Sequence, residues 1–249
     1  MHIELIGCTS AGKSTLAGNV LAACRQQGVE ILLGDEFVLR QWHLQWVRSR
    51  PVRSLLVNGV GLLASLLTWR KNRALYRFAA LVLFRLSIPR VERLQLLRNV
   101  LKKLGVYEII RRRSSNRQVI LVDEGTLQIA HNLFVHASAA VDPALIPEFA
   151  AIVPLPDVVV YLRQPEELLV ERIVERGHSR LPDRSKTQVT RFVRQAIAVF
   201  DQLVQQPAVA ARVLITDGED SGIEAALKGD GLMLGRLAEV VGSGFLWAG

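Results

Sequence analysis

The sequence predicts an α/β fold in which a parallel five-stranded sheet is flanked by helices, with a large helical insert between the second and third strands. Short apolar runs alternate with longer segments of helical composition, and several of these runs end in glycine or in acidic residues. A third observation is one stretch of about eighty residues that is helical in composition throughout. With 249 residues, 50% of them hydrophobic and 22% charged, the chain can build one sizeable core, so we expect a single domain over residues 1–249.

The first two strands are expected close to the N-terminus. Residues 2–7 (HIELIG) form a short apolar run that ends in glycine, and residues 11–28 have helix composition with a glycine at their end. A second apolar run follows at 29–34, and Asp35 and Glu36 come directly after it. The order is therefore strand, loop, helix, strand, with two acids at the tip of the second strand.

Residues 37–117 form the predicted insert. Their composition is helical, and Pro51, Pro89 and Gly105 are expected to interrupt the helices. The uncharged run 54–69 is shorter than the roughly 20 residues that a membrane-spanning helix needs, so no transmembrane segment is predicted. Together with a second apolar run, FAALVLF, it suggests a helical hairpin.

The positive charge of the chain is concentrated in this insert. Residues 48–117 contain 17 Lys and Arg against two acids, a net charge of +15, whereas the rest of the chain sums to −7. Two interpretations stay open: a buried helix pair whose arginines remain in water, or a surface that lies on anionic lipid, with Trp69 at one end. Nucleic acid is not the expected partner, because the arginines alternate with apolar residues and the segment has few aromatic residues on which bases could stack.

The C-terminal half supplies the other three strands. Residues 117–125 form a continuous apolar run that ends in Asp123 and Glu124, as expected of a buried parallel strand whose tip carries function. The remaining predicted elements are a helix at 126–141, a strand at 157–162, a helix at 165–177, a charged loop at 178–186, a helix at 187–206 and a strand at 212–218. Prolines at 143, 147, 154 and 156 are expected to punctuate the stretch before the fourth strand, and a last helix is expected between the fifth strand and a Gly-rich tail.

A phosphate-binding motif stands between the first strand and the first helix. The pattern G-x-x-x-x-G-K-S/T predicts a glycine-containing loop whose backbone N–H groups point at phosphate oxygens. Lys13 would reach the β- and γ-phosphates and the Ser14 hydroxyl would complete a Mg²⁺ shell, so ATP and Mg²⁺ are the expected cofactors. The alternative is a turn that binds nothing. The residues expected to bind the nucleotide here are Gly7, Cys8, Thr9, Ser10, Ala11, Gly12, Lys13, Ser14 and Thr15.

Acidic residues at two strand tips are candidates for the chemistry. Asp123 is the expected magnesium ligand, by residue type and position. The proton of an attacking hydroxyl needs a carboxylate, and Asp35, Glu36 and Glu124 remain open for that role. Each acid could instead cap a helix or be solvated. Cys8 could be a redox-sensitive thiol, or simply a small side chain that fits the loop.

Four arginines recur at four-residue steps, at positions 172, 176, 180 and 184. The helical spacing places Arg172 and Arg176 on one face, and the loop after Gly177 is expected to carry Arg180 and Arg184 outward. Such a loop could close over the phosphates and neutralise charge on the transferred group. The alternative is a solvated charged face.

These residues resemble the thymidylate-kinase-like branch of P-loop kinases. The resemblance covers the motif at 7–14, the acidic strand end at 123–125 and the block 156–184, in which Asp183 and Arg184 match the end of that family's lid. It implies an ATP:acceptor phosphotransferase whose lid closes over the nucleotide. It also implies adenine contacts at the end of the fifth strand, by Thr216, Asp217 and Gly218.

One departure from that family concerns the acceptor. Thymidylate kinases carry Asp-Arg at the end of the third strand, and the Arg holds the acceptor's phosphate, whereas this chain has Asp123-Glu124-Gly125. An acid there repels a phosphorylated acceptor, so a neutral hydroxyl is a better expectation than a nucleoside monophosphate. The basic insert suggests an acceptor that is large, anionic away from the reacting hydroxyl, or presented at a membrane.

The compartment is expected to be the cytoplasm. Cys8 and Cys24 cannot supply a disulfide framework or a zinc site, and the opening residues MHIELIGCTS lack the features of a secretion signal. A protein that uses the basic insert on lipid would lie at the inner membrane face. Two alternatives to a kinase remain: a P-loop NTPase switch, and a membrane-surface nucleotide-binding protein without a phosphorylated acceptor.

Overall fold

The computed structural model describes residues 1–26, 30–115, 118–136, 142–178, 180–181 and 185–217. A five-stranded sheet with the order β2-β3-β1-β4-β5 runs through its centre, and every neighbouring pair of strands is parallel. This confirms the predicted fold class. The strands are β1 (His2–Ile6), β2 (Ile31–Leu33), β3 (Val119–Val122), β4 (Val158–Arg163) and β5 (Val213–Asp217).

The strands follow from near-continuous apolar sequence. All five residues of β1 and all four of β3 are buried, as parallel strands covered on both faces must be. In register, Ile3 of β1 lies beside Leu121 of β3 and beside Val158 of β4. The carboxyl ends of β1, β2 and β3 therefore come together at one edge of the sheet, where ligands of such folds bind.

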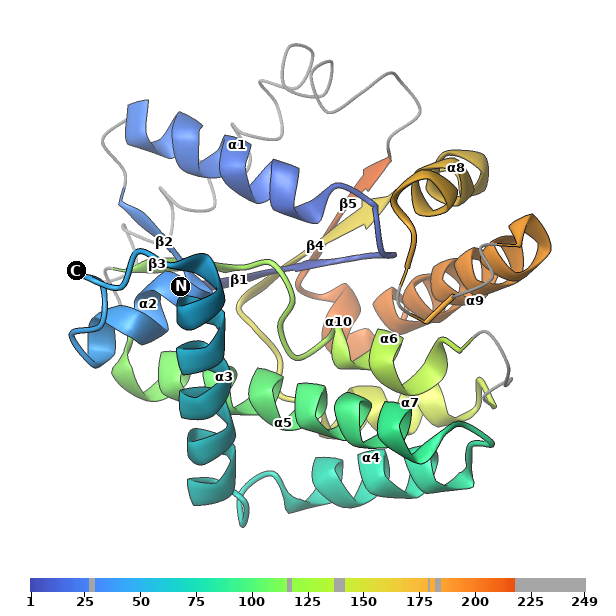
Figure 1. Ribbon diagram of the computed structural model, residues 1–249, viewed down its shortest axis with the longest axis horizontal. Coiled ribbons are helices and arrows are strands. Elements are labelled where there is room, and N and C mark those ends of the chain that lie inside the picture. Colours follow the sequence, from blue (N-terminus) through green and yellow to red (C-terminus); the bar gives the residue numbers. More distant parts are fainter. Residues whose placement is uncertain (27–29, 116–117, 137–141, 179, 182–184, 218–249) are drawn as a thin grey trace.

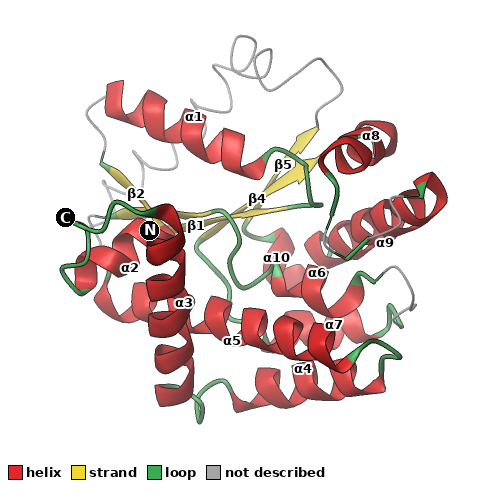
Figure 2. Ribbon diagram, viewed as in Figure 1, coloured by secondary structure: helices red, strands yellow, loops and turns green. Residues whose placement is uncertain are grey.

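Helices cover both faces of the sheet. In the view of Figures 1 and 2, α1 lies above the sheet, and α5, α6 and α9 lie below it. The helices are α1 (Lys13–Gln26), α2 (Gly34–Gln41), α3 (Arg50–Leu67), α4 (Arg73–Arg85), α5 (Arg90–Arg113), α6 (Ile129–Phe134), α7 (Leu145–Ile152), α8 (Glu166–Arg176), α9 (Lys186–Val204) and α10 (Pro207–Ala210). In the described part of the chain, no helix is both long and apolar enough to cross a bilayer.

Two apolar clusters join the insert to the sheet. One large apolar cluster unites the sheet with α1, α4, α6, α7 and α9. A second, smaller cluster packs Phe37 of α2, Val57 of α3 and Ile109 of α5 against Ile120 of β3. Helix α5 contributes to both clusters, through Leu104 to the first and through Ile109 to the second. It is the element that attaches the insert to the sheet.

The expected helical hairpin is wrong. Helices α3 and α4 do not pair along their lengths: α4 lies beside α5, and α3 crosses α5 (Figure 1). Pro51 and Pro89 do mark helix starts, since Pro51 lies in the first turn of α3 and Pro89 directly precedes α5. Gly105 lies inside α5 and does not interrupt it, so the prediction of a helix break at this position is also wrong.

Gly105 serves the crossing of α3 over α5. A Cβ at this position would collide with the carbonyl of Gly61, in the middle of α3. A Cβ at Gly61 would in turn come within 3.1 Å of the Lys102 carbonyl. The two glycines let the helix backbones approach closely, and this close contact outweighs the modest helix-weakening effect of glycine.

Three further predictions differ from the structure or lie outside it. The segment with prolines at 143, 147, 154 and 156 contains α7, with Pro147 in the first turn, where proline is tolerated. The helix predicted at 126–141 is shorter, since α6 covers only Ile129–Phe134 and residues 137–141 are outside the described residues. The last predicted helix, after residue 218, also lies outside them.

Candidate functional site

The loop between β1 and α1 has the curled backbone that a phosphate-binding motif requires. Gly7 and Gly12 have φ of +142° and +96°, and Ser10 adopts φ of +66°. A Cβ at Gly7 would lie 2.7 Å from the carbonyl oxygen of Leu162 in β4, so only glycine fits there. Lys13 is buried, and its Nζ donates hydrogen bonds to the carbonyls of Gly7 (3.1 Å) and Cys8 (2.9 Å). The lysine is thus held against its own loop.

A layer of polar residues that the sequence analysis missed supports this loop. The Gln128 side chain accepts a hydrogen bond from the Gly7 amide (3.3 Å) and donates one to the Gly7 carbonyl (3.0 Å). Glu4 of β1, fully buried, accepts hydrogen bonds from the backbone amides of Thr126 (2.9 Å) and Gln128 (3.1 Å). Burial raises the pKa of Glu4 to about 7. The sequence feature that pointed to this polar layer was a single acid, Glu4, inside the first apolar run.

Ser14 and Asp123, the two residues expected to hold Mg²⁺, meet at the start of α1. The Ser14 hydroxyl donates a 2.5 Å hydrogen bond to Asp123 Oδ2, and burial raises the pKa of this carboxyl. The other oxygen, Oδ1, is buried and has no hydrogen-bond partner among the described residues. A hydroxyl beside a carboxylate with a spare oxygen fits Mg²⁺, which takes one or two carboxylates and completes its shell with phosphates and water.

Zinc fits the described residues less well than Mg²⁺ does. Among the described residues, no group of three His, Cys, Asp or Glu side chains could hold a metal ion. A structural or catalytic zinc needs at least three such ligands. The donor set at Ser14 and Asp123 therefore suits a nucleotide-bound Mg²⁺ and not a protein-enclosed zinc.

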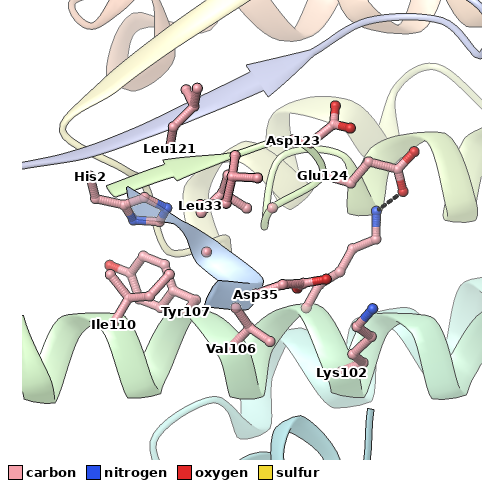
Figure 3. A pocket seen from close by; sticks show the side chains of 14 residues that line it. His2, Leu33, Asp35, Lys102, Val106, Tyr107, Ile110, Leu121, Asp123 and Glu124 are labelled. Carbon is pink, nitrogen blue, oxygen red and sulfur yellow. Dashed lines mark hydrogen bonds and ion pairs between the residues drawn. The ribbon is translucent and has the colours of Figure 1, made fainter. Parts of the chain in front are cut away.

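A cavity of about 330 Å³ opens beside Asp123, between the carboxyl ends of β2 and β3 and helix α5 (Figure 3). Figure 3 shows charged side chains at one end and His2 with Tyr107 at the other. Its walls between these ends are mainly apolar. The lining residues are His2, Leu33, Gly34, Asp35, Lys102, Lys103, Val106, Tyr107, Ile110, Leu121, Val122, Asp123, Glu124 and Gly125.

The three candidate proton acceptors have different surroundings. Asp35, in the first turn of α2, lines the cavity. Glu36 does not line it and is paired with Arg40 one turn along the same helix, at 3.2 Å. Glu124 lines the cavity but is paired with the buried Lys103 at 3.0 Å, and this ammonium lowers the pKa of Glu124 to about 2. A carboxylate with so low a pKa is a weak base.

His2 marks the end of the cavity away from Asp123. Its Nε2 is buried and has no hydrogen-bond partner in the described residues, and burial lowers the pKa of His2 to about 4. The imidazole ring lies 5.6 Å from the ring of Tyr107, measured between centroids. A neutral imidazole with an unused nitrogen can hydrogen-bond a polar group of a ligand that reaches this end.

Among the three recurring arginines that the structure describes, Arg172 is the one with a hydrogen bond to the phosphate-binding loop. Its guanidinium donates a hydrogen bond to the Ser10 carbonyl at 3.3 Å. Arg176, one turn further along α8, is exposed and makes no hydrogen bond or ion pair with the described residues. Gly177, with φ of +72°, ends the helix. Arg184, and Asp183 before it, lie outside the described residues.

The expectation that Arg180 points outward is wrong. It donates hydrogen bonds to the Val135 carbonyl (3.0 Å) and to His131 Nδ1 (2.9 Å), and it lies over the Phe192 ring at 5.4 Å. Burial lowers the pKa of His131 well below its ordinary value, so the ring is neutral and can accept this bond. The inward position follows from these three partners, none of which the four-residue spacing of the arginines reveals.

Of the remaining residues that the sequence assigned to the site, some lie in the described part of the chain and some outside it. Cys8 is buried, and burial raises the pKa of its thiol to about 12, which favours the small side chain over the redox-sensitive thiol. Thr15 is exposed in the first turn of α1. Asp217 is the last residue of β5, and Gly218 lies outside the described residues.

Comparison with known proteins leaves function open. No family model matches the chain, and no curated protein matches it. Among solved structures it is similar to deoxyadenosine kinase from M. mycoides with bound dCTP (17% identity, TM-score 0.44), with the products dCMP and dCDP (15%, 0.48), and with dATP (14%, 0.46). Each comparison covers 96% of this chain and 100% of the other. Likeness at this level says nothing of activity or substrate.

Proposed function

We propose that this protein is a kinase that transfers the γ-phosphoryl group of ATP to a hydroxyl group of an acceptor bound in the cavity beside Asp123. The observation that carries the proposal is the contact between the Ser14 hydroxyl and Asp123, at a curled phosphate-binding loop that adjoins this cavity. An NTP site and an acceptor site thus share one residue, Asp123. Phosphoryl transfer needs mainly this positioning of two substrates, with little covalent help from the protein.

The phosphate-binding loop holds the donor. Its backbone amides and the N-terminus of α1 favour the negative phosphates, and Lys13 adds a positive charge at the β- and γ-phosphates. The hydrogen bond from Arg172 to the Ser10 carbonyl holds this part of the loop in place. Ser14 and Asp123 would hold Mg²⁺. When bound, this ion would neutralise negative charge on the phosphate oxygens.

Asp35 is the acid we assign to the acceptor's proton. In the reaction, the acceptor oxygen forms a bond to the γ-phosphorus, and the bond from phosphorus to the bridging oxygen breaks, leaving its electrons on ADP. The hydroxyl proton passes to the Asp35 carboxylate. Asp35 lines the cavity, whereas Glu36 does not and Glu124 is neutralised by Lys103.

The lining of the cavity favours an acceptor that is uncharged at its reacting end. Asp35, Asp123 and Glu124 all lie at the end where transfer would occur, and they repel a phosphate there. The apolar walls and His2 suit an acceptor with an apolar body and a polar group at its far end. Lys102 also lines the cavity, at its charged end (Figure 3), and has no salt bridge with a described residue.

The test is transfer of labelled γ-phosphate from ATP into two separate extracts, one of soluble metabolites and one of membrane lipids. Wild type, Lys13→Ala and the control Lys186→Ala, an exposed lysine at the start of α9, are compared. The proposal predicts label in an acceptor with wild type and Lys186→Ala, reduced at least about 100-fold in Lys13→Ala.

The same experiment can contradict the proposal. If free phosphate is the only labelled product in both extracts, the protein hydrolyses ATP without an acceptor and acts as an NTPase switch. If label reaches the acceptor equally in Lys13→Ala, the transfer does not use this loop.

A further inference from the structure

We propose that the outer face of α3, α4 and the first turns of α5 docks on the surface of an anionic lipid bilayer. Of the thirteen large apolar side chains that are exposed among the described residues, twelve lie between Trp42 and Leu94. A soluble surface rarely gathers this much exposed apolar area without a binding role. The inference is independent of the kinase function, because it concerns a different face of the molecule.

The exposed apolar side chains follow the period of the helices. In α3, Leu55, Leu63 and Leu66 recur every eight or three residues on one side, while Val57, Gly61 and Ser65 are buried on the other. In α4, Leu81 and Phe84 are exposed, 58% and 67%, while Val82 and Leu83 are buried. Both helices therefore bury one apolar face in the protein and present a second one outward. Figure 1 places α4 at the border of the molecule opposite α1.

Exposed arginines lie in the same helices and loops as these side chains. Arg48, Arg50, Arg70, Arg73, Arg77 and Arg85 are exposed, and none forms a salt bridge with a described residue. Of the two acids between residues 48 and 117, Glu108 is buried and already paired with Lys71, Arg111 and Arg112. The other, Glu92 in the first turn of α5, offsets a single positive charge. The positive charge at this face is therefore largely uncompensated by protein. It is complementary to the negative charge of anionic lipid headgroups.

A groove between α4 and α5 also brings apolar side chains and arginines together. The cavity measures about 400 Å³ and has Leu83, Phe84, Leu94 and Leu97 in its walls, with Arg90 and Arg93 at the same place. The Arg93 guanidinium lies 5.2 Å from the centre of the Phe84 ring and donates to the Leu86 carbonyl at 2.9 Å. An apolar trough beside two guanidinium groups suits an acyl chain and the phosphate of its headgroup.

Two other occupants fit this face less well. A second copy of the chain would bring two strongly positive surfaces together, and like charges oppose such a symmetric contact. Nucleic acid would engage the arginines but would leave the leucines and Phe84 exposed to water. An anionic bilayer satisfies both the charge and the apolar side chains. In the described residues no helix can span a membrane, so the protein would lie on its surface.

The test is co-sedimentation of the full chain with two kinds of vesicle, one of phosphatidylcholine alone and one of equal parts phosphatidylcholine and phosphatidylglycerol, at low and high salt. We expect binding to the anionic vesicles that weakens in high salt. Arg77→Gln/Arg85→Gln and Leu81→Ser/Phe84→Ser should each lower the partition coefficient about tenfold or more.

Two control variants remove similar side chains elsewhere. Ile215→Ser removes an exposed apolar residue of β5, and Arg191→Gln/Arg194→Gln removes two exposed arginines of α9. Both should bind vesicles as wild type does, and circular dichroism should show that all four variants are folded.

Three results would overturn the inference. They are equal binding to neutral and anionic vesicles, equal loss of binding in the patch and control variants, and absence of vesicle binding. In the last case, a dimer that Leu81→Ser/Phe84→Ser dissociates would assign the face to a second copy, and salt-sensitive binding of duplex DNA would assign it to nucleic acid.

Discussion

Asp35 and Glu36 are neighbouring carboxylates in different surroundings, and this difference gives the first prediction. Asp35→Asn should lower kcat by about 100-fold or more, because the variant can no longer accept the acceptor's proton. Glu36→Gln should leave kcat within about twofold, since Glu36 faces Arg40 and not the cavity. Steady-state kinetics of the two variants checks this. Full activity in Asp35→Asn, with loss of activity in Glu124→Gln, would assign the base to Glu124.

Arg172 and Arg176 form a second matched pair, one helical turn apart on α8. Arg172→Met should raise the KM for ATP several-fold, with a smaller change in kcat, because it removes the hydrogen bond to the Ser10 carbonyl in the phosphate-binding loop. Arg176→Met should change neither constant. Initial-rate measurements over a range of ATP concentrations separate the two. An equal rise of KM in both variants would mean that the general positive charge of α8 matters and the contact to Ser10 does not.

At the residue scale, the sequence predicted the part of the site that a local motif encodes. Lys13 and Ser14 lie where their motif predicts, and Asp123 meets Ser14 because the carboxyl ends of adjacent parallel strands share one edge. Gln128 and Lys103 could not be found in this way. Gln128 contacts Gly7 across 121 positions of sequence, and Lys103 is one cation among many in a basic segment until the fold brings it to Glu124.

At the scale of elements, the crossing of α3 and α5 gives the third prediction. Gly105→Ala should lower the free energy of unfolding by about 1–3 kcal/mol, because the added Cβ collides with the Gly61 carbonyl. Gly59→Ala is the control, two residues from Gly61 on the same helix, with no heavy atom within 4 Å of the added Cβ. It should raise stability by about 0.5–1 kcal/mol, because alanine favours the helix.

Urea unfolding of both variants measures the two effects. If Gly105→Ala were as stable as wild type, the helices would have room to separate, and the close crossing would not be needed for stability. Circular dichroism in the absence of urea would show whether α3 and α5 keep their helical content.

The elements were predictable where one segment's own composition decides its structure. The five apolar runs became the five strands, and Pro51 and Pro89 marked the starts of α3 and α5. The arrangement of the insert was not predictable, because it depends on which helix each apolar face meets. Gly105 shows the difficulty: glycine is frequent at helix ends, and here only the contact with Gly61 shows that it serves a close crossing instead.

For the whole molecule, buried histidines predict how stability depends on pH. Burial lowers the pKa of His2, His136 and His178 to about 4, and that of His131 also falls well below its ordinary value near 6.5. Between these values the unfolded chain binds protons that the folded protein excludes. The free energy of unfolding should therefore fall as the pH is lowered from about 6.5 to about 4, by about 1.4 kcal/mol per pH unit for each proton.

Two carboxyl groups act in the opposite direction but are outnumbered. The raised pKa values of Glu4 and Asp123 favour the folded state as the pH falls, and for Glu4 this applies from about 7 to its ordinary value near 4.3. Urea unfolding across this range measures the sum. His136→Gln should reduce the slope by up to one proton. A free energy of unfolding that is constant between about 6.5 and 4 would contradict the prediction.

Helix α5 limits which parts of the insert can be removed or exchanged without loss of the cavity. An insert between two strands looks like a module that could be removed or exchanged, but only the outer faces of α3 and α4 could vary in this way, because their inner faces pack in the two apolar clusters. The 24 residues of α5 could not, because the helix supplies one wall of the cavity, the Lys103 partner of Glu124 and packing residues of both apolar clusters. A graft of this cavity onto another sheet must therefore carry α5 with it.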